Sequence, residues 1–283
     1  MNSLTLMGVK GGPAIGPGSN MPSSTLVRMG GKTILVDAGL GATRGLCDQG
    51  VELRAIDLII VTHLHSDHYL ELGPLFHTAW TAGLTKPIEV IGPSGLAHYW
   101  NHFVTAMDFD VRLRIEDEGR CDFQSLCNLR TILEGEIYTA DDLTISAMKN
   151  DHPPIKESFA LRLETKDKTL ALSGDTAMMP EMIEFATGAD LLLHEAMLLE
   201  GVDALIKRVD PGNERLRNHI VRSHTSAEDT GRIAKAAGVK AMALNHFVPD
   251  GDPNFTEAHW QAKVRETWDG VLHIGRDGMT IEF

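Results

Sequence analysis

Apolar and polar positions along the chain predict short strands that alternate with helices. The segment 57–62 (DLIIVT) is an almost continuous apolar run, which is typical of a strand buried on both faces of a sheet. Other β-prone runs are bounded by glycine turns. Strands are predicted at 24–28, 33–36, 57–62, 88–91, 143–148, 159–164, 169–173, 191–194, 241–244, 272–274 and 279–282, and helices at 69–82, 96–107 and 225–237.

The order of these segments predicts an α/β fold in one domain, residues 1–283. Two parts of similar content, divided near residue 140, indicate two sheets packed face to face with helices outside. The stretch 111–145 mixes charges with short β-prone pieces. At the end of the chain, the strands 272–274 and 279–282 flank the turn at 276–278 and are expected to form a hairpin.

Composition is ordinary for a globular protein, with 43% hydrophobic and 23% charged residues among 283. No apolar run reaches the roughly 18 residues that span a bilayer, and the start of the chain does not resemble a secretory signal. We therefore expect a cytoplasmic protein without membrane contact. Three cysteines predict no disulfide framework. The formal charge of −13 disfavours nucleic acid as a partner.

Four potential metal ligands occur in one hexapeptide, directly after the apolar run 57–62. The sequence is His63-Leu64-His65-Ser66-Asp67-His68. His63 and His65 stand two positions apart at a strand end and point to one side, and the following turn can bring Asp67 and His68 close by. Imidazole and carboxylate suit Zn²⁺ and similar ions. A loop of solvated histidines is the alternative, but this density of donors favours a metal site.

The hexapeptide is similar to the HxHxDH signature of the metallo-β-lactamase superfamily. Three later motifs match in order: His152 in NDHP, Asp175 in LALSGDT and His246 in MALNHFVP. The resemblance covers nearly the whole chain. It implies a four-layer αβ/βα metallo-β-lactamase sandwich with two metal ions between the sheets.

By this resemblance, the protein is a hydrolase with two divalent ions, most often zinc, with manganese or iron as alternatives. His63, His65 and His152 would hold one ion, Asp67, His68 and His246 would hold the other, and Asp175 would bridge them. A hydroxide between the ions would attack the substrate, with Asp67 also counted among the catalytic residues. Asp37, in LVDAGLG, matches a family aspartate near the metals, and a turn residue is an equal alternative.

A narrower resemblance joins DLLLHEAM (190–197) and SHTSA (223–227) to ribonuclease Z and its arylsulfatase-like and phosphodiesterase relatives. It implies that Glu195 and His224 form a pair that protonates the leaving group. The chain departs from ribonuclease Z at Ser66, where that group has glycine, and in the short segment between His152 and Asp175, where some members carry a tRNA-binding arm. We therefore expect a small phosphodiester, sulfate ester or related substrate, and no nucleic acid.

Several weaker features complete the picture. Five basic residues follow Glu195: Lys207, Arg208, Arg215, Arg217 and Arg222. They are candidates for a cap that attracts anions to the site, although a solvated helix face or a dimer contact is the more common explanation. Lys156 and Ser158 follow His152 and are candidates to face the substrate. Phe76, Trp80, Met178 and Met179 are candidates for an apolar pocket, with core packing as the default. The glycine-rich segment 11–18 is expected to form a mobile loop at the rim of the site.

Two alternatives to the small-ester hydrolase stay open. A lactonase or carboxylic ester hydrolase could use the same metals with less need for an acid at His224. A binding protein that kept the fold and lost turnover is the second, and the full set of predicted ligands argues against it. His98 and His102 could pair on a helix, but surface or core positions are favoured. A homodimer is expected.

Overall fold

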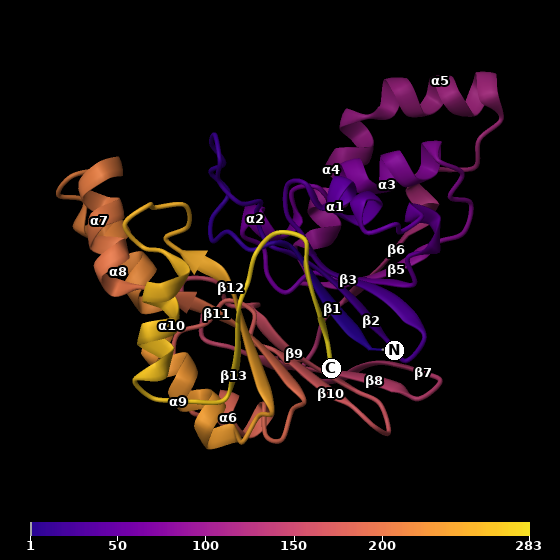
Figure 1. The fold of residues 1–283 in the computed structure, drawn as a ribbon. Coiled ribbons are helices and arrows are strands. Elements are labelled where there is room, and N and C mark those ends of the chain that lie inside the picture. Colours follow the sequence, from indigo (N-terminus) through magenta and orange to yellow (C-terminus); the bar gives the residue numbers. More distant parts are fainter. Residues whose placement is uncertain (1) are drawn as a thin grey trace.

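The computed structural model of the protein describes residues 2–283 and contains two seven-stranded sheets in this range. The first sheet has the strand order β14-β1-β2-β3-β4-β5-β6, and the second has the order β13-β12-β11-β10-β9-β8-β7. Figure 1 shows the two sheets face to face, with helices on the outer side of each and both chain ends at the same side of the molecule. This arrangement confirms the predicted αβ/βα sandwich.

The first sheet and its helices come mainly from the first half of the chain. Their bounds are β1 (Ser3–Gly8), β2 (Ser24–Met29), β3 (Lys32–Ala38), α1 (Ala42–Asp48), β4 (Leu58–Ile60), α2 (Ser66–Tyr69), α3 (Leu72–Thr81), β5 (Ile88–Gly92), α4 (Leu96–Ala106), α5 (Asp108–Glu118), β6 (Cys127–Thr131) and β14 (Met279–Glu282), with 3₁₀ turns at Leu53–Ala55 and Gln124–Leu126.

The second sheet and its helices follow. Their bounds are β7 (Gly135–Ala140), β8 (Leu143–Lys149), β9 (Phe159–Glu164), β10 (Thr169–Leu172), α6 (Glu181–Phe185), β11 (Leu191–Met197), α7 (Leu199–Val209), α8 (Glu214–Ser223), α9 (Ala227–Ala237), β12 (Ala241–Val248), α10 (Glu257–Arg265) and β13 (Val271–Ile274). Within residues 2–283, none of the helices has both the length and the apolar character needed to cross a membrane.

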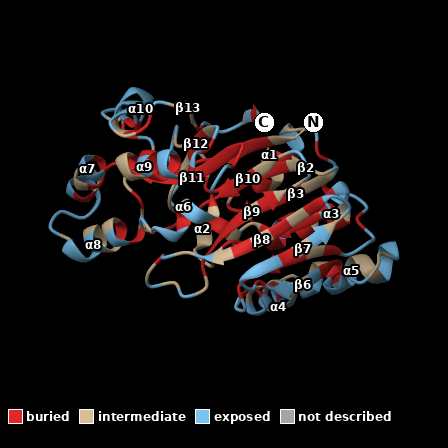
Figure 2. Cartoon of the chain, turned by 90° about the horizontal axis from the view of Figure 1, so that it is seen from below, coloured by how far each residue is buried: buried red, intermediate tan, exposed pale blue. Residues whose placement is uncertain are grey.

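Two apolar layers hold the first sheet in place. In β3, Ile34 and Val36 face the second sheet, while Leu35 between them faces the outer helices. Side chains alternate across a strand, so a strand buried on both faces supplies both layers at once. Figure 2 shows buried residues along the strands of both sheets and exposed residues on the outer helices. The core between the sheets thereby fixes the strand ends from which the candidate ligands project.

The predicted C-terminal hairpin is wrong. β13 pairs with β12 in the second sheet, and β14 pairs with β1 in the first. The turn between them crosses from one sheet to the other, and Asp277 accepts hydrogen bonds there from the amides of Val9 and Met21. A β-prone pattern predicts that a segment is extended but does not choose its partner, since pairing depends on the whole sheet.

Two other segments differ from the expectation. The stretch 111–145 begins as a helix, because its first residues, through Glu118, complete α5, which is supported by the i,i+4 ion pairs Arg112–Asp108 and Arg114–Asp110. The predicted helix 69–82 is interrupted between α2 and α3. There Glu71 accepts hydrogen bonds from the amides of Gly41 and Thr43, next to the start of α1, which explains why the chain turns at that point.

Candidate metal centre

The hexapeptide that starts at His63 lies where the chain leaves β4 and enters α2. Asp37, at the end of β3, holds this segment: its Oδ1 accepts from the amide of Thr62 at 2.7 Å, and its Oδ2 accepts from the Thr62 hydroxyl at 3.0 Å. The same Oδ2 lies 2.7 Å from His68 Nδ1. Asp37 has φ +60°, a conformation that suits short polar residues more than β-branched ones. Of its two interpretations, the structure favours the one that places it beside the metal-binding segment.

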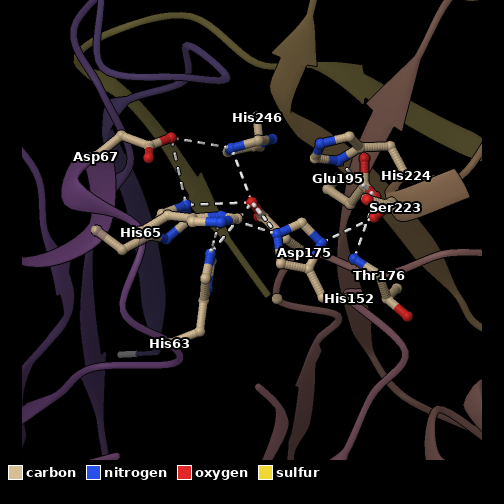
Figure 3. A network of polar contacts seen from close by, with 12 residues as sticks. His63, His65, Asp67, His152, Asp175, Thr176, Glu195, Ser223, His224 and His246 are labelled. Carbon is tan, nitrogen blue, oxygen red and sulfur yellow. Dashed lines mark hydrogen bonds and ion pairs between the residues drawn. The ribbon is translucent and has the colours of Figure 1, made fainter. Parts of the chain in front are cut away.

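The first group of donors consists of His63, His65, His152 and Asp175. His65 Nδ1 lies 3.2 Å from His63 Nε2 and 3.0 Å from His152 Nε2, although His152 follows β8 in the other half of the sandwich. Figure 3 shows these rings turned toward one point between the two halves of the chain. Residues far apart in the sequence therefore present their donor atoms to a common centre.

The second group consists of Asp67, His68 and His246. His246 Nε2 lies 3.3 Å from Asp67 Oδ2, and His68 Nε2 lies 3.6 Å from the same oxygen. Sequence analysis placed His246 just past a strand, whereas it lies inside β12 at an irregularity. Asn245 and Phe247, on either side of it, pair with Glu195 and Ala196 of β11. His246 itself is left out of this pairing and has φ +44°. This bulge turns the imidazole toward the cluster.

Asp175 connects the two groups. Its Oδ2 lies 3.0 to 3.9 Å from the Nε2 atoms of four histidines: His63, His68, His152 and His246. Gly174 before it has φ +58°, and a Cβ there would lie 2.6 Å from the carbonyl oxygen of Phe159. A residue without a side chain is thus required at the turn that directs Asp175 into the cluster.

The donor set fits divalent ions. Donors that share one tetrahedral zinc at about 2.0–2.1 Å are about 3.3 Å apart, which matches the nitrogen–nitrogen distances of 3.0 and 3.2 Å in the first group. His68 Nε2 and His246 Nδ1 are buried and lack a hydrogen-bond partner. Buried polar atoms are rarely left unsatisfied in proteins, so an ion that accepts the Nε2 lone pairs explains the arrangement around His68.

Three of the imidazoles are oriented through their other ring nitrogen. His152 Nδ1 lies 2.9 Å from the carbonyl oxygen of Ser223, His63 Nδ1 lies 3.1 Å from the Thr62 hydroxyl, and His68 Nδ1 faces Asp37. Such contacts fix the tautomer that leaves Nε2 free for a metal.

Burial and neighbouring charges divide the histidines into two kinds. Burial lowers the pKa of His63 well below its usual value and that of His65 to about 4, and it also lowers the pKa of His152. Burial acts in the same direction on His246, but Asp175 outweighs it and raises the pKa of His246 to about 10. The three histidines of the first group are therefore neutral and have lone pairs available at pH 7.

The predicted acid pair lies beside the second group. His224 Nδ1 is 3.2 Å from Glu195 Oε1, and the same oxygen accepts from the amides of Thr176 and Thr225 at 3.2 and 3.0 Å. Glu195 is in β11, rather than at a helix start, and is buried. The His224 ring stacks on the His246 ring at a centroid distance of 5.3 Å. The carboxylate thus positions His224 at the edge of the cluster (Figure 3).

A cavity of about 430 Å³ opens over the cluster. Its floor includes His65, Asp67 and Asp175, and one wall is the segment 10–14. The predicted place of the glycine-rich loop at the rim agrees with this, since the amide of Gly12 donates to Asp67 Oδ2 at 2.8 Å. The opposite wall comes from α7 and α8, with Leu205, Val209, Leu216, His219 and Ile220. These wall residues were not among the predicted site residues, although their four-residue spacing along each helix is typical of an apolar helix face.

The helices α7 and α8 therefore cover the site, but the five basic residues on and between them do not line its cavity. Arg208 pairs with Asp252 and Arg217 with Asp203 at the surface. These ion pairs agree with the explanation favoured from the sequence, a solvated helix face, and the wall of the cavity is apolar instead of basic.

Other candidates lie away from the cluster. Lys156 is exposed and Ser158 is buried, and the cavity wall includes neither. Phe76 and Trp80 belong to the core under the helices of the first sheet, and Met179 packs against the core between the sheets. Met178 is exposed. The rings of His98 and His102 lie 4.1 Å apart on the exposed side of α4, and His102 Nδ1 contacts the His98 carbonyl oxygen.

The fold and the donor cluster define a metallo-β-lactamase-fold hydrolase of the ribonuclease Z-like kind, which confirms the resemblance stated from the motifs. Structural similarity covers the whole length: the metallo-β-lactamase-fold protein YhfI from Bacillus subtilis superimposes with a TM-score of 0.73 at 21% identity, over 100% of both chains. The short form of human tRNase Z superimposes with a TM-score of 0.70 at 21% identity, over 99% of this chain and 98% of that one.

The family can be stated more narrowly. Residues 2–246 match the family model described as "Anti-Pycsar protein Apyc1". Ribonuclease Z of Mycolicibacterium gilvum is 30% identical over 272 residues, which are 93% of this chain and 92% of the relative. The chain belongs to the Apyc1 family and is similar along nearly its whole length to ribonuclease Z.

These relatives overturn the prediction that nucleic acid is not a partner. Proteins named ribonuclease Z are about 30% identical over nearly the entire chain, and that name denotes action on RNA. The prediction rested on a net charge of −13. Net charge sums the whole surface, whereas binding depends on the local field at one site, so the sum could not exclude this class of partner.

Proposed function

We propose that the protein is a dinuclear metal-dependent phosphodiesterase. The observation that carries the proposal is the position of Asp175, whose Oδ2 lies within 3.9 Å of histidine nitrogens from both donor groups. A single carboxylate oxygen among four imidazoles suits a bridge between two cations. The ribonuclease Z relatives favour the phosphodiester among the esters that such a centre could hydrolyse.

The candidate ligands would hold the two ions in two sets. His63, His65 and His152 would hold one ion, Asp67, His68 and His246 the other, and Asp175 both. When bound, two divalent ions, most simply zinc given the histidine-rich donor set, would supply a water of lowered pKa and would polarise the phosphoryl group. The amide of Gly12 donates to Asp67 and orients its carboxylate, so that the Oδ2 atom faces His246.

His224 would act as the general acid for the leaving oxygen. Glu195 accepts two backbone amide hydrogen bonds and is buried, which fixes its carboxylate opposite His224 Nδ1. His224 itself borders the cavity. The pair is thereby placed to give a proton to an alkoxide as it departs.

Two substrate classes are compatible with this site. A small phosphodiester, or a sulfate ester of similar shape, fits the cavity of about 430 Å³, which lies within the range of small-molecule sites. An RNA phosphodiester is the second candidate, favoured by the names of the relatives. A lactone or carboxylic ester is a weaker candidate, because the Glu195–His224 pair serves a leaving group that departs.

The decisive experiment is a substrate panel after reconstitution with zinc, manganese or iron. The panel contains bis(p-nitrophenyl) phosphate, p-nitrophenyl sulfate, a lactone, a thioester and a precursor tRNA. We expect phosphodiester hydrolysis that a chelator abolishes, and that Asp175→Asn abolishes, while Asp167→Asn, at a site away from the cluster, leaves it unchanged. Turnover of the lactone or thioester alone would contradict the proposal.

The homodimer, the cytoplasmic location and the organisation as one domain stay predictions. Size measurement in solution, by light scattering coupled to gel filtration, tests the first of them.

A further inference from the structure

The α7–α8 pair is tied to the candidate metal centre at its last residue. The Ser223 carbonyl oxygen accepts from His152 Nδ1 at 2.9 Å, and the Ser223 hydroxyl donates to the carbonyl oxygen of Pro153 at 2.7 Å. Ser223 is fully buried. The end of α8 therefore has one position relative to the cluster, where Figure 3 shows Ser223 beside His152. The wall that the two helices form thus has a fixed place over the cluster.

The side of α7 and α8 that faces the cavity is apolar. Leu205 and Val209 are one turn apart on α7, and Leu216 and Ile220 are one turn apart on α8. Val209 is 62% exposed. Leu205 and Leu216 are partly buried and Ile220 is buried. An apolar wall of this kind next to a polar, histidine-rich floor is a pattern of ligand sites, where an apolar part of the ligand covers the exposed part of the wall.

His219 is the one polar side chain that α7 and α8 contribute to the lining of this cavity, within the described range. Its ring is half-buried, at a centroid distance of 6.2 Å from the His65 ring and nearly perpendicular to it. The imidazole lies between the apolar wall and the floor. It can donate to, or accept from, a polar atom of a group that lies against that wall.

We infer that the face formed by Val209, Leu216 and Ile220 binds a planar ring on the retained side of the phosphodiester, and that His219 hydrogen-bonds a polar edge of that ring. The inference rests on the proposed function, which it makes more specific. A flat ring covers about 150–250 Å² of apolar surface with little conformational freedom to lose. A ring of this kind fills the wall while the phosphoryl group stays over the cluster.

The test compares three esters with the same leaving group, p-nitrophenolate, which differ only in the retained group: methyl, phenyl or thymidine 5′. Because the bond that breaks is the same, differences in kcat/KM report on the retained group. We expect the wild-type protein to favour phenyl over methyl by about tenfold or more, as for other apolar pockets. In Leu216→Ser this ratio falls several-fold, because kcat/KM falls more for the phenyl ester than for the methyl ester.

The matched control is Arg215→Ser, on the same helix. Arg215 is exposed and does not line the cavity, so its replacement keeps the wild-type ratio. His219→Ala raises KM for the thymidine ester several-fold with kcat maintained and leaves the phenyl ester unchanged, and His219→Gln, which retains a donor, restores much of the loss. Equal losses on all three esters would show a structural role and would overturn the assignment of His219.

Binding without turnover separates this inference from the proposed function. Calorimetric titration of the metal-loaded protein compares phenylphosphonate with methylphosphonate, neither of which is hydrolysed. Tighter binding of the phenyl compound, lost in Leu216→Ser, supports the ring subsite even if no phosphodiester is turned over, in which case only the proposed function fails. Equal affinity for both phosphonates in the wild-type protein overturns the subsite.

Discussion

His68 lies between two carboxylates, with Nδ1 2.7 Å from Asp37 Oδ2 and Nε2 3.2 Å from Asp175 Oδ2. Asp37 also binds the amide and hydroxyl of Thr62, directly before the hexapeptide. One side chain therefore orients the imidazole of a candidate metal ligand and the backbone that carries it. Contacts of this kind typically contribute a factor of 10–100 to metal affinity.

Replacement of Asp37 with alanine is accordingly expected to weaken metal binding by about 10–100-fold. The loss falls mainly on the ion held by His68, while the first group keeps its ligands. Competition with a coloured chelator measures both affinities. Asp57→Ala is the control, since Asp57 lies at the surface and binds only the amide of Thr33 by its side chain. Unchanged affinity for both ions in Asp37→Ala would show that Asp37 does not support the centre.

The Glu195–His224 pair predicts a dependence on the leaving group. His224→Ala is expected to lower kcat by about 10²–10⁴-fold for phosphodiesters with alkyl leaving groups, because these need a proton as they depart. The loss is small for p-nitrophenolate, which leaves unprotonated. Glu195→Gln shows the same trend, since it replaces the carboxylate that positions His224. A plot of log kcat against the pKa of the leaving group has a steeper slope in both variants than in the wild-type protein; parallel lines would disprove the acid role.

The segment 10–14 predicts a steric effect at Gly11. A Cβ at this position would lie 2.6 Å from Val248 Cγ2 and 2.8 Å from the carbonyl oxygen of Phe247. Gly11→Ala therefore displaces the segment that carries the Gly12–Asp67 hydrogen bond, and we expect a loss of about 1–3 kcal/mol in the free energy of unfolding. Chemical denaturation measures it. Gly16→Ala, which meets no neighbour within 4 Å, is the control and is expected to keep wild-type stability.

We expect the free energy of unfolding to depend on pH through Asp190. Burial raises its pKa, but Lys240, the amide of Thr169 and Lys168 outweigh this and hold the pKa below its ordinary value. The folded pKa is thus lower than the unfolded pKa of about 3.9. The stabilisation is present at neutral pH and is lost as the pH falls below about 4.

Asp190→Asn is therefore expected to lower the free energy of unfolding by about 1 kcal/mol at pH 7. The difference from the wild-type protein shrinks as the pH falls below about 4. Denaturant titrations at several pH values measure it. A difference that stays constant down to pH 3 would assign the effect to packing instead of charge.

The family resemblance predicted the seven candidate ligands, and the density of donors in one hexapeptide independently indicated a metal site. Four of them share a hexapeptide, and Asp175 follows an apolar strand and the glycine its turn requires. The two-sheet architecture followed from the alternation of strands and helices together with the resemblance. His246 was predicted by the same resemblance, but its bulge was not, since that arises from the register between β11 and β12.

The sequence did not predict which distant strands pair or which side of each helix faces the cavity. The segment after Gly275 looks like half of a hairpin, but β14 completes the first sheet beside β1. The basic residues of 207–222 lie on the charged side of α7 and α8, whereas Leu216 and Ile220 on the other side line the cavity. Which side of an amphipathic helix matters depends on what it covers, and only the structure shows that.

The most direct measurement of the central claim is the metal content of the purified protein and of Asp175→Ala, by elemental mass spectrometry on samples of known concentration. We expect two divalent ions per wild-type chain and activity that rises only as the second ion binds. The variant is expected to bind fewer ions and to show no turnover. Full activity at one ion per chain, or two ions and normal turnover in Asp175→Ala, would contradict it.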